Sequence, residues 1–197
     1  VSCSDLFMDR VIANEDFTLF DPYDTKDLPE LYGKEFETRY KYYEELSKTN
    51  PEYFVNPPKV VNAKDLWKKF QTMFWETGIP FIFFKDEANR SFFRDIKQEF
   101  IDNGDLGLIR SANLCQEYLS PIKDDEVTLC NLGSVNIAKI KSKEQLKRVV
   151  TLANRMLDNV IDVSSYKIPN SEATQKIRRS IGLGVCGEAE AVAELGI

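Results

Sequence analysis

Apolar side chains recur at helical spacing in several stretches of the chain. Between residues 28 and 48, leucines and aromatic residues return every three or four positions, which predicts a long amphipathic helix with its aromatic stripe in the core. Asn62 stands where it can cap a second helix, whose apolar face includes Met73 and Phe74, and Gly78 stands where that helix should end. A helix is predicted after Ser4, a possible cap, and another over residues 87–102, with an inward face of Phe92, Phe93, Ile96 and Phe100. Ser142 and Gln145 form a capping-box pattern that opens a further helix, and helices are also predicted over 171–179 and at the end of the chain.

Three stretches have the composition of strands. Residues 80–84, PFIFF, predict a short buried strand, and residues 108–121 and 127–140 are the two best strand candidates, joined by a charged loop. The glycine-rich residues 182–187 are expected to form a turn between two helices. Strands that alternate with long helices indicate an α/β fold with mainly parallel pairing.

The stretch 108–121 places three chemically active side chains at alternate positions. Asn113, Cys115 and Glu117 carry an amide, a thiol and a carboxylate, and on an extended backbone all three point the same way. Spacing alone favours a purely structural interpretation, in which these side chains form the polar face of an edge strand and Cys115 serves as a small apolar residue. The alternative is a redox cleft, because the short loop before Cys130 can bring a second thiol close, and thiols beside a carboxylate suit work on a hydroxylated substrate.

The composition narrows the possible chemistry. With 197 residues and 43% hydrophobic content, the chain can bury the core of one domain. It contains no histidine, which excludes Ser-His-Asp and Cys-His catalysis and removes the commonest metal ligand. The four cysteines are too scattered for a CxxC site or a secreted disulfide framework. The remaining candidates are carboxylates and thiols: any pairing among the cysteines should be redox chemistry or nothing, and no metal is expected to bind this chain.

The charge is spread unevenly. Residues 1–57 carry 13 acidic and 6 basic side chains, whereas residues 58–197 carry 19 and 20. Neither part has the basic stripe that grips a nucleic-acid polymer. No apolar run approaches the ~20 residues that cross a bilayer, and the first residues lack the pattern of a signal peptide. We expect a cytoplasmic protein without a membrane partner.

Residues 182–187, GLGVCG, match the G-x-G-x-x-G pattern of dinucleotide-binding turns. The match follows a predicted helix, and only ten residues come after it in this sequence. The acidic ribose-binding residue expected ~20 positions later is therefore absent from the sequence. A close turn between a helix and a strand, without a ligand, is the preferred interpretation.

The stretches NLCQE and LCNLGSVN resemble the catalytic large subunit of class I ribonucleotide reductase. The resemblance covers essentially all 197 residues, since further landmarks of that family follow in the same order: DLFMDRV, FTLFDP, LYGKEFETRY, TGIPFIFFKD, LDNVID and IRRSIGLGVCG. It implies that residues 1–197 are a partial catalytic barrel domain, with an acidic helical segment over 1–57 and the site-bearing strands and helices over 58–197. The implied fold is part of a ten-stranded α/β barrel with the radical cysteine on a central finger loop, where Cys115 would lie in a turn instead of a strand.

The resemblance also implies a role for each candidate residue. Cys115 becomes a transient thiyl radical that removes the 3′ hydrogen of the ribose, and Glu117 takes the proton of the 3′ hydroxyl. Asn113 binds the hydroxyl groups of the substrate and orients the ring. Cys130 is one member of a redox-active pair whose other cysteine lies outside this chain. The implied activity is the reduction of ribonucleoside diphosphates to deoxyribonucleotides for DNA synthesis.

The implied partners are the remaining segments of the large subunit, a radical-generating small subunit that contains a metal, and thioredoxin or glutaredoxin as reductant. No cofactor is expected to bind this chain directly, and the chain alone is expected to be inactive. Cys186 and Glu188 depart from the family, which is expected to have larger apolar residues there. Two alternatives stay open: a non-catalytic truncated paralogue or binding module, and a cobalamin-dependent class II reductase.

Overall fold

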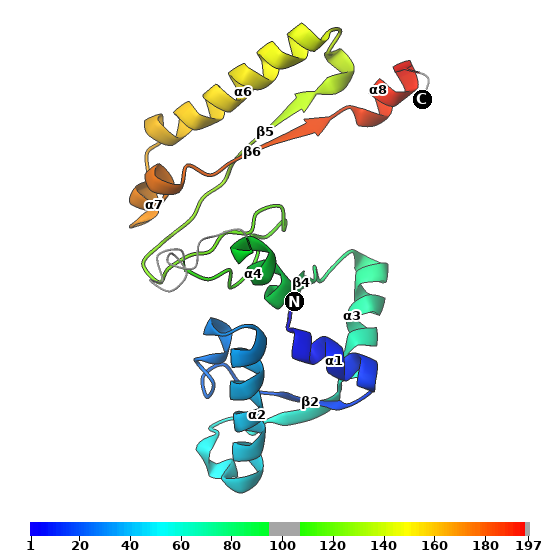
Figure 1. The fold of residues 1–197 in the computed structure, drawn as a ribbon, viewed down its shortest axis with the longest axis vertical. Helices are drawn as coiled ribbons and strands as arrows, with labels where there is room; N and C mark the ends of the chain where they lie inside the picture. Colours follow the sequence, from blue (N-terminus) through cyan, green and yellow to red (C-terminus); the bar gives the residue numbers. More distant parts are fainter. Residues whose placement is uncertain (95–106, 196–197) are drawn as a thin grey trace. The chain divides into compact units, whose positions relative to one another are not determined.

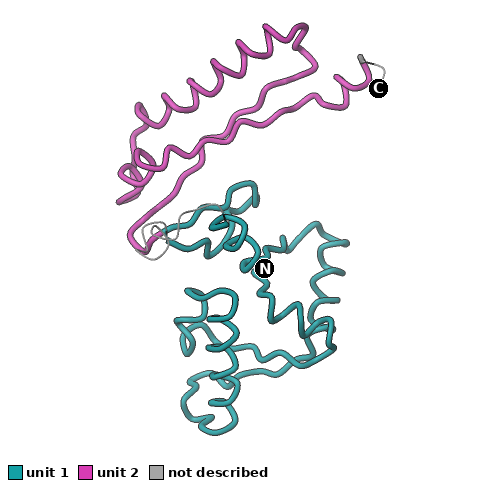
Figure 2. The backbone as a smooth tube through the Cα atoms, viewed as in Figure 1, with its two compact units in different colours: residues 1–122 teal, residues 123–197 magenta. Residues whose placement is uncertain are grey.

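The computed structural model describes residues 1–94 and 107–195 (Figure 1). Contacts between Cα atoms divide the chain into two compact units, residues 1–122 (unit 1) and residues 123–197 (unit 2), which Figure 2 shows in separate colours. Each unit has its own secondary structure.

Unit 1 combines helices with two small sheets. The elements in chain order are β1 (Ser2–Cys3), α1 (Asp5–Ala13), β2 (Asp16–Leu19), the 3-10 turn η1 (Leu28–Glu30), α2 (Gly33–Thr49), the 3-10 turn η2 (Pro51–Tyr53), β3 (Lys59–Asn62), α3 (Ala63–Thr77), β4 (Phe83–Phe84) and α4 (Lys85–Phe93). Strand β1 runs parallel to β4, and β2 runs antiparallel to β3.

Helices α1 and α3 begin where their capping residues predicted. The Ser4 hydroxyl accepts a hydrogen bond from the Phe7 N–H at 3.2 Å, and the Asn62 side chain accepts one from the Asp65 N–H at 3.1 Å. Helix α3 ends at Gly78, whose φ of +76° is easiest for glycine. These local signals are strong because each satisfies backbone groups that the helix itself leaves unpaired.

Several predicted boundaries in unit 1 need correction. Helix α2 begins at Gly33 and not at residue 28, because the proline of η1 sets a separate turn and the next two residues are extended. The strand predicted over residues 80–84 is limited to β4. Met73 and Phe74, predicted to face inward, are about half exposed. The helix predicted over residues 87–102 begins at Lys85, and its predicted core residues Ile96 and Phe100 lie outside the described residues.

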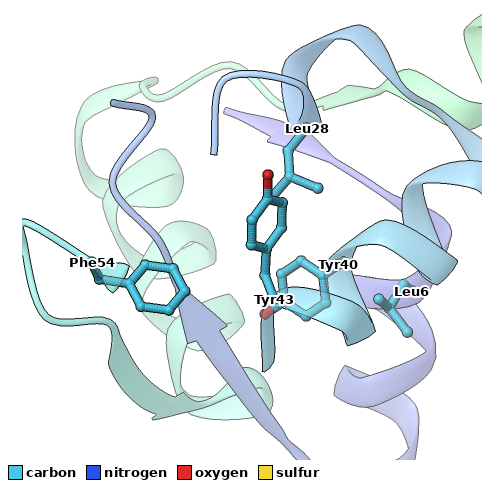
Figure 3. Packing of buried hydrophobic residues seen from close by; sticks show 5 residues of the cluster. All are labelled: Leu6, Leu28, Tyr40, Tyr43 and Phe54. Carbon is cyan, nitrogen blue, oxygen red and sulfur yellow. The ribbon is translucent and has the colours of Figure 1, made fainter. Parts of the chain in front are cut away.

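The aromatic stripe of α2 packs into one of the two core clusters of unit 1, as its spacing predicted. Tyr40 and Tyr43 are buried against Leu6, Leu28 and Phe54 (Figure 3). The Tyr40 hydroxyl also donates to the Thr18 carbonyl at 2.6 Å and accepts from the Thr18 N–H at 2.7 Å. Tyr40 therefore contributes to the core in two ways: its ring packs against apolar side chains, and its hydroxyl bonds α2 to the backbone of β2.

An ion pair supports this core from the side of α1. The Arg10 guanidinium donates to both carboxylate oxygens of Glu44 at 2.6 Å, and the Thr18 hydroxyl donates to the same carboxylate at 2.9 Å. The two charged side chains are only 11% and 16% exposed. Burial alone would raise the pKa of Glu44, but the hydrogen bonds from Arg10 and Thr18 lower it below the ordinary glutamate value.

We expect the Arg10–Glu44 pair to make unit 1 sensitive to acid. Because the folded-state pKa of Glu44 is lowered, its contribution is present above the unfolded pKa and is lost as the pH falls through the folded pKa. Glu44→Gln should lower the free energy of unfolding at neutral pH by about 2–3 kcal/mol. Urea denaturation at neutral and acidic pH checks this. The difference between the midpoint at neutral pH and the midpoint at acidic pH should be smaller in Glu44→Gln than in the wild type. Glu37, which is exposed and pairs with Lys41, provides the control: Glu37→Gln should change the urea midpoints little.

Unit 2 is a βαβ arrangement. The elements are β5 (Asn131–Asn136), the 3-10 turn η3 (Ile137–Lys139), α6 (Lys143–Val163), α7 (Ser171–Arg178), β6 (Ile181–Cys186) and α8 (Glu188–Leu195). Strands β5 and β6 run parallel and pair over six residues each, and the chain passes from one to the other through α6 and α7 (Figure 1). The predicted capping box opens α6, since the Ser142 hydroxyl accepts from the Gln145 N–H at 3.1 Å.

The predicted glycine-rich turn over residues 182–187 is wrong, because most of it forms β6. Apolar residues at 181, 183 and 185 alternate with glycines, which is the period of a strand. A Cβ at Gly182 would meet the Leu132 side chain at 2.7 Å, so this glycine lets β5 and β6 pack closely. The turn is confined to Gly187, with φ +74°, and Cys186 and Glu188 are both exposed. Gly182 therefore has a packing role, and Gly187 provides the turn.

The described residues have the predicted mixed α/β class, with two parallel strand pairs and one antiparallel pair. These strands do not close into a barrel over residues 1–94 and 107–195. No helix in the described part of the chain is both long and apolar enough to cross a membrane.

Candidate functional site

Asn113, Cys115 and Glu117 lie in an irregular loop of unit 1, so the strand predicted over residues 108–121 is wrong. The loop is closed at its base by a single antiparallel bridge between Leu108 and Ile122, with N···O distances of 3.3 and 3.1 Å. At its tip the chain turns instead of extending. The turn agrees with the position that the family resemblance implied for Cys115.

The turn is set by backbone and side-chain hydrogen bonds of Asn113. The Gln116 N–H donates to the Asn113 carbonyl at 3.1 Å, which closes a turn with Leu114 and Cys115 at its centre, and Gln116 adopts φ +65°. The Asn113 side-chain oxygen accepts from the Tyr118 N–H at 3.1 Å. Asparagine suits this position because its short amide can bond to nearby backbone.

The two reactive groups of the loop are open to solvent. Cys115 is a free, exposed cysteine, and the side chain of Glu117 is exposed too. Because the backbone turns between Asn113 and Gln116, the predicted alternation on one face of a strand does not occur. The thiol and the carboxylate are two positions apart in the chain, and both are exposed at the turn.

A hollow of about 260 Å³ lies beside the loop tip within unit 1. Asn113, Leu114 and Gln116 line it from the loop, and Phe81 and Phe83 line it from the region of β4. The Asn113 amide oxygen is engaged with the loop backbone, whereas none of the described residues accepts a hydrogen bond from its nitrogen. The amide nitrogen is therefore the part of Asn113 that can donate to a ligand hydroxyl.

The base of the loop is held to α4 by Asn89, which no motif or spacing in the sequence singled out. Asn89 is fully buried and bonds through its amide to both backbone groups of Ile109, at 3.1 and 3.0 Å. The available signal was its position: Asn89 lies three and four residues before Phe92 and Phe93, on the apolar side of a predicted amphipathic helix. A polar residue there requires buried partners.

Two cations connect the same region to η1. Lys85 is buried and donates to the Pro29 carbonyl, and burial lowers the pKa of its ammonium. Arg110 pairs with Glu30 at 2.5 Å and also donates to the Ile122 carbonyl at 3.3 Å. The contacts of Arg110 lie at the base of the loop, away from its exposed tip.

Cys130 belongs to unit 2 and is half-buried directly before β5. Its sulfur lies 3.7 Å from the position that a Cβ on Gly182 would take, so it packs beside β6. The segment leading to it is attached to α7: Arg178 pairs with Glu126 at 2.5 Å, and Thr174 accepts from the Val127 N–H at 3.3 Å. The strand predicted over 127–140 is shorter and begins just after Cys130.

A cleft that contains both Cys115 and Cys130 stays a prediction, since the two cysteines belong to different units. Among the described residues, no three acidic or cysteine side chains are grouped as metal ligands. What the loop itself offers is an exposed thiol, a carboxylate and an amide donor. This set can exchange electrons, accept a proton and orient a hydroxyl.

Comparison with known proteins gives consistent matches over 95–98% of the chain. The ribonucleoside-diphosphate reductase subunit alpha of Helicobacter pylori is 37% identical over 96% of this chain and 29% of its own length. The subunit alpha of Chlamydia trachomatis is 37% identical over 98% of this chain and 18% of its own length. The large subunit of Danio rerio is 34% identical over 95% of this chain and 22% of its own length.

The chain spans less than a third of the length of these relatives. The family model described as "Ribonucleotide reductase, barrel domain" matches residues 1–197, which is every residue of the chain. The chain therefore belongs to the ribonucleotide reductase barrel-domain family.

Proposed function

We propose that residues 1–197 are the site-bearing part of a class I ribonucleoside-diphosphate reductase large subunit, which reduces ribonucleotides to deoxyribonucleotides for DNA synthesis. The observation that carries the proposal is the family match over the whole chain together with a loop that presents Asn113, Cys115 and Glu117 on a turn. Relatives in bacteria and in an animal bear the name of this enzyme. The ten-stranded barrel, with this loop as its central finger, is part of the proposal.

In this proposal the exposed loop performs the first steps on the ribose. A thiyl radical on Cys115 takes the 3′ hydrogen atom, which leaves a carbon radical on the substrate and an S–H bond on the protein. Glu117 accepts the proton of the 3′ hydroxyl, as a carboxylate within hydrogen-bond reach can. The Asn113 amide nitrogen donates to a substrate hydroxyl and holds the ring in place.

Cys130 and its partner cysteine supply the reducing equivalents. The 2′ hydroxyl leaves as water, and the two thiols give up two electrons and two protons as they form a disulfide. Cys115 then returns its hydrogen atom to the 3′ carbon and regains the thiyl radical. The net change is one hydroxyl replaced by hydrogen, one water released and one disulfide formed.

The proposed partners follow from this chemistry. A metal-containing small subunit generates the radical that reaches Cys115, and thioredoxin or glutaredoxin reduces the disulfide that contains Cys130. The remaining segments of the large subunit supply the second cysteine of that pair. The proposed site of action is the cytoplasm, where thiols are kept reduced.

An assay of the complete large subunit with its small subunit, a dithiol reductant and ribonucleoside diphosphates tests the proposal. We expect turnover, and we expect Glu117→Gln to lower kcat by about 10²–10⁴-fold, the usual contribution of a general base. The exposed Glu52 of η2, changed to Gln, is the matched control and should leave kcat unchanged. Lack of nucleotide reduction by the wild-type complex would contradict the proposed activity.

A further inference from the structure

We infer that Asn89 is a positioning residue for the loop that carries Asn113 and Cys115, an inference that rests on the proposed function. Asn89 lies in α4 and is 0% exposed. Its amide oxygen accepts from the Ile109 N–H at 3.1 Å, and its amide nitrogen donates to the Ile109 carbonyl at 3.0 Å and to the Lys85 carbonyl at 2.9 Å. The side chain thus joins two backbone segments that are 20 positions apart.

The paired bonds make Asn89 a substitute for a neighbouring strand. In an antiparallel sheet, two facing residues exchange an N–H and a C=O bond, and Asn89 offers Ile109 the same pair from a side chain. Ile109 is 1% exposed, so without this amide its backbone groups would be buried without partners. Aspartate lacks the donors, and an aliphatic residue lacks both the donors and the acceptor.

The other contacts at the base of the loop either are weaker or join the loop only to itself. The bridge between Leu108 and Ile122 joins the loop to itself. The pair between Arg110 and Glu30 is partly open to solvent, with the Glu30 side chain 47% exposed, and such pairs contribute little. Asn89 is therefore the buried connection between the loop and the body of unit 1.

Ile109, the loop residue that Asn89 holds, lies four positions before Asn113 and six before Cys115. Removal of a hydrogen atom requires the sulfur to lie within contact distance of one C–H bond, and a displacement of ~1 Å can cost ~10²-fold in rate. A side chain that touches neither substrate nor radical can in this way control the rate by setting where the loop begins.

The test compares Asn89→Ala with Asp86→Ala in the complete enzyme. Asp86 is equally buried in α4, but its carboxylate accepts from the Asp5 N–H at 2.8 Å and so supports α1, not the loop. We expect Asn89→Ala to lower kcat about tenfold or more and to raise the deuterium isotope effect measured with 3′-deuterated substrate, because hydrogen removal then limits turnover. Loss of folded protein lowers kcat without changing that isotope effect, which should stay at the wild-type value in Asp86→Ala.

A second measurement does not depend on activity. Amide hydrogen exchange of residues 107–118 should be at least about tenfold faster in Asn89→Ala than in wild type, and unchanged in Asp86→Ala. If Asn89→Ala fails to fold, Asn89→Asp, which keeps the shape and the acceptor, replaces it in both measurements. A wild-type isotope effect or wild-type exchange in the Asn89 variant would overturn the inference. Failure of the proposed function is recognised separately, by lack of turnover in the wild-type complex.

Discussion

Replacement of Cys115 by serine is expected to abolish nucleotide reduction by the complete enzyme. The hydroxyl of serine is close to the thiol in size. Its O–H bond is stronger than an S–H bond, however, so an enzyme that oxidises a cysteine to a thiyl radical cannot form the corresponding radical on serine. Because Cys115 is exposed at the tip of a turn whose hydrogen bonds use backbone groups and Asn113, the substitution should leave the loop intact. Substrate binding should persist while neither deoxyribonucleotide nor cleavage of the 3′ C–H bond is detected.

The matching variant Cys130→Ser separates the two thiol roles. Cys130 is proposed to act after hydrogen removal, so this variant should still cleave the 3′ C–H bond while it fails to complete reduction. Release of tritium from 3′-labelled substrate measures the first step, and formation of deoxyribonucleotide measures the whole reaction. Full reduction by Cys115→Ser would show that Cys115 is not the radical residue. Loss of C–H cleavage in Cys130→Ser but not in Cys115→Ser would show that the two roles are exchanged.

The sequence was a good guide to unit 1 where the signals are local. Ser4, Asn62 and Gly78 mark the ends of α1 and α3, because each one satisfies or relaxes the backbone of its immediate neighbours. The spacing of Tyr40 and Tyr43 likewise predicts which face of α2 is buried. No contact distant in the chain was needed for these predictions.

The candidate site shows the opposite case. Its residue types were evident, but the alternation of Asn113, Cys115 and Glu117 predicted a strand, whereas the chain forms a turn there. The turn depends on the left-handed φ of Gln116, and glutamine gives no sequence signal for that conformation. The position of the loop depends on Asn89, a contact between residues 20 apart, which periodicity cannot reveal.

The missed strand β6 has a different cause. Three glycines gave residues 182–187 the appearance of a turn, although the apolar residues that alternate with Gly182 and Gly184 have the period of a strand. Gly182 is needed because the Leu132 side chain occupies the space of a Cβ, and this requirement exists only once β5 lies beside β6. Pairing of distant strands therefore decided what local composition had left ambiguous.

Replacement of Tyr40 is expected to give the largest loss of stability among substitutions in the core of unit 1. Tyr40 is 2% exposed, and its ring stacks on Phe17 with centroids 4.7 Å apart. Burial raises the pKa of its hydroxyl, which therefore stays protonated and donates to the Thr18 carbonyl throughout the neutral range. Tyr40→Ala should lower the free energy of unfolding by about 3–5 kcal/mol, through the lost packing and the cavity left behind.

Tyr40→Phe separates the ring from its hydroxyl. It keeps the stacked ring but leaves the Thr18 N–H and C=O without their partner, so we expect a loss of about 1–3 kcal/mol. Tyr42, on the same helix and 51% exposed, is the control, and Tyr42→Phe should cost less than about 0.5 kcal/mol. Both tryptophans of the chain, Trp67 and Trp75, lie on α3, so their fluorescence during urea denaturation reports on unit 1. Equal midpoints for Tyr40→Phe and wild type would show that the hydroxyl does not hold β2 to α2, and would leave the ring alone to account for the effect of Tyr40→Ala.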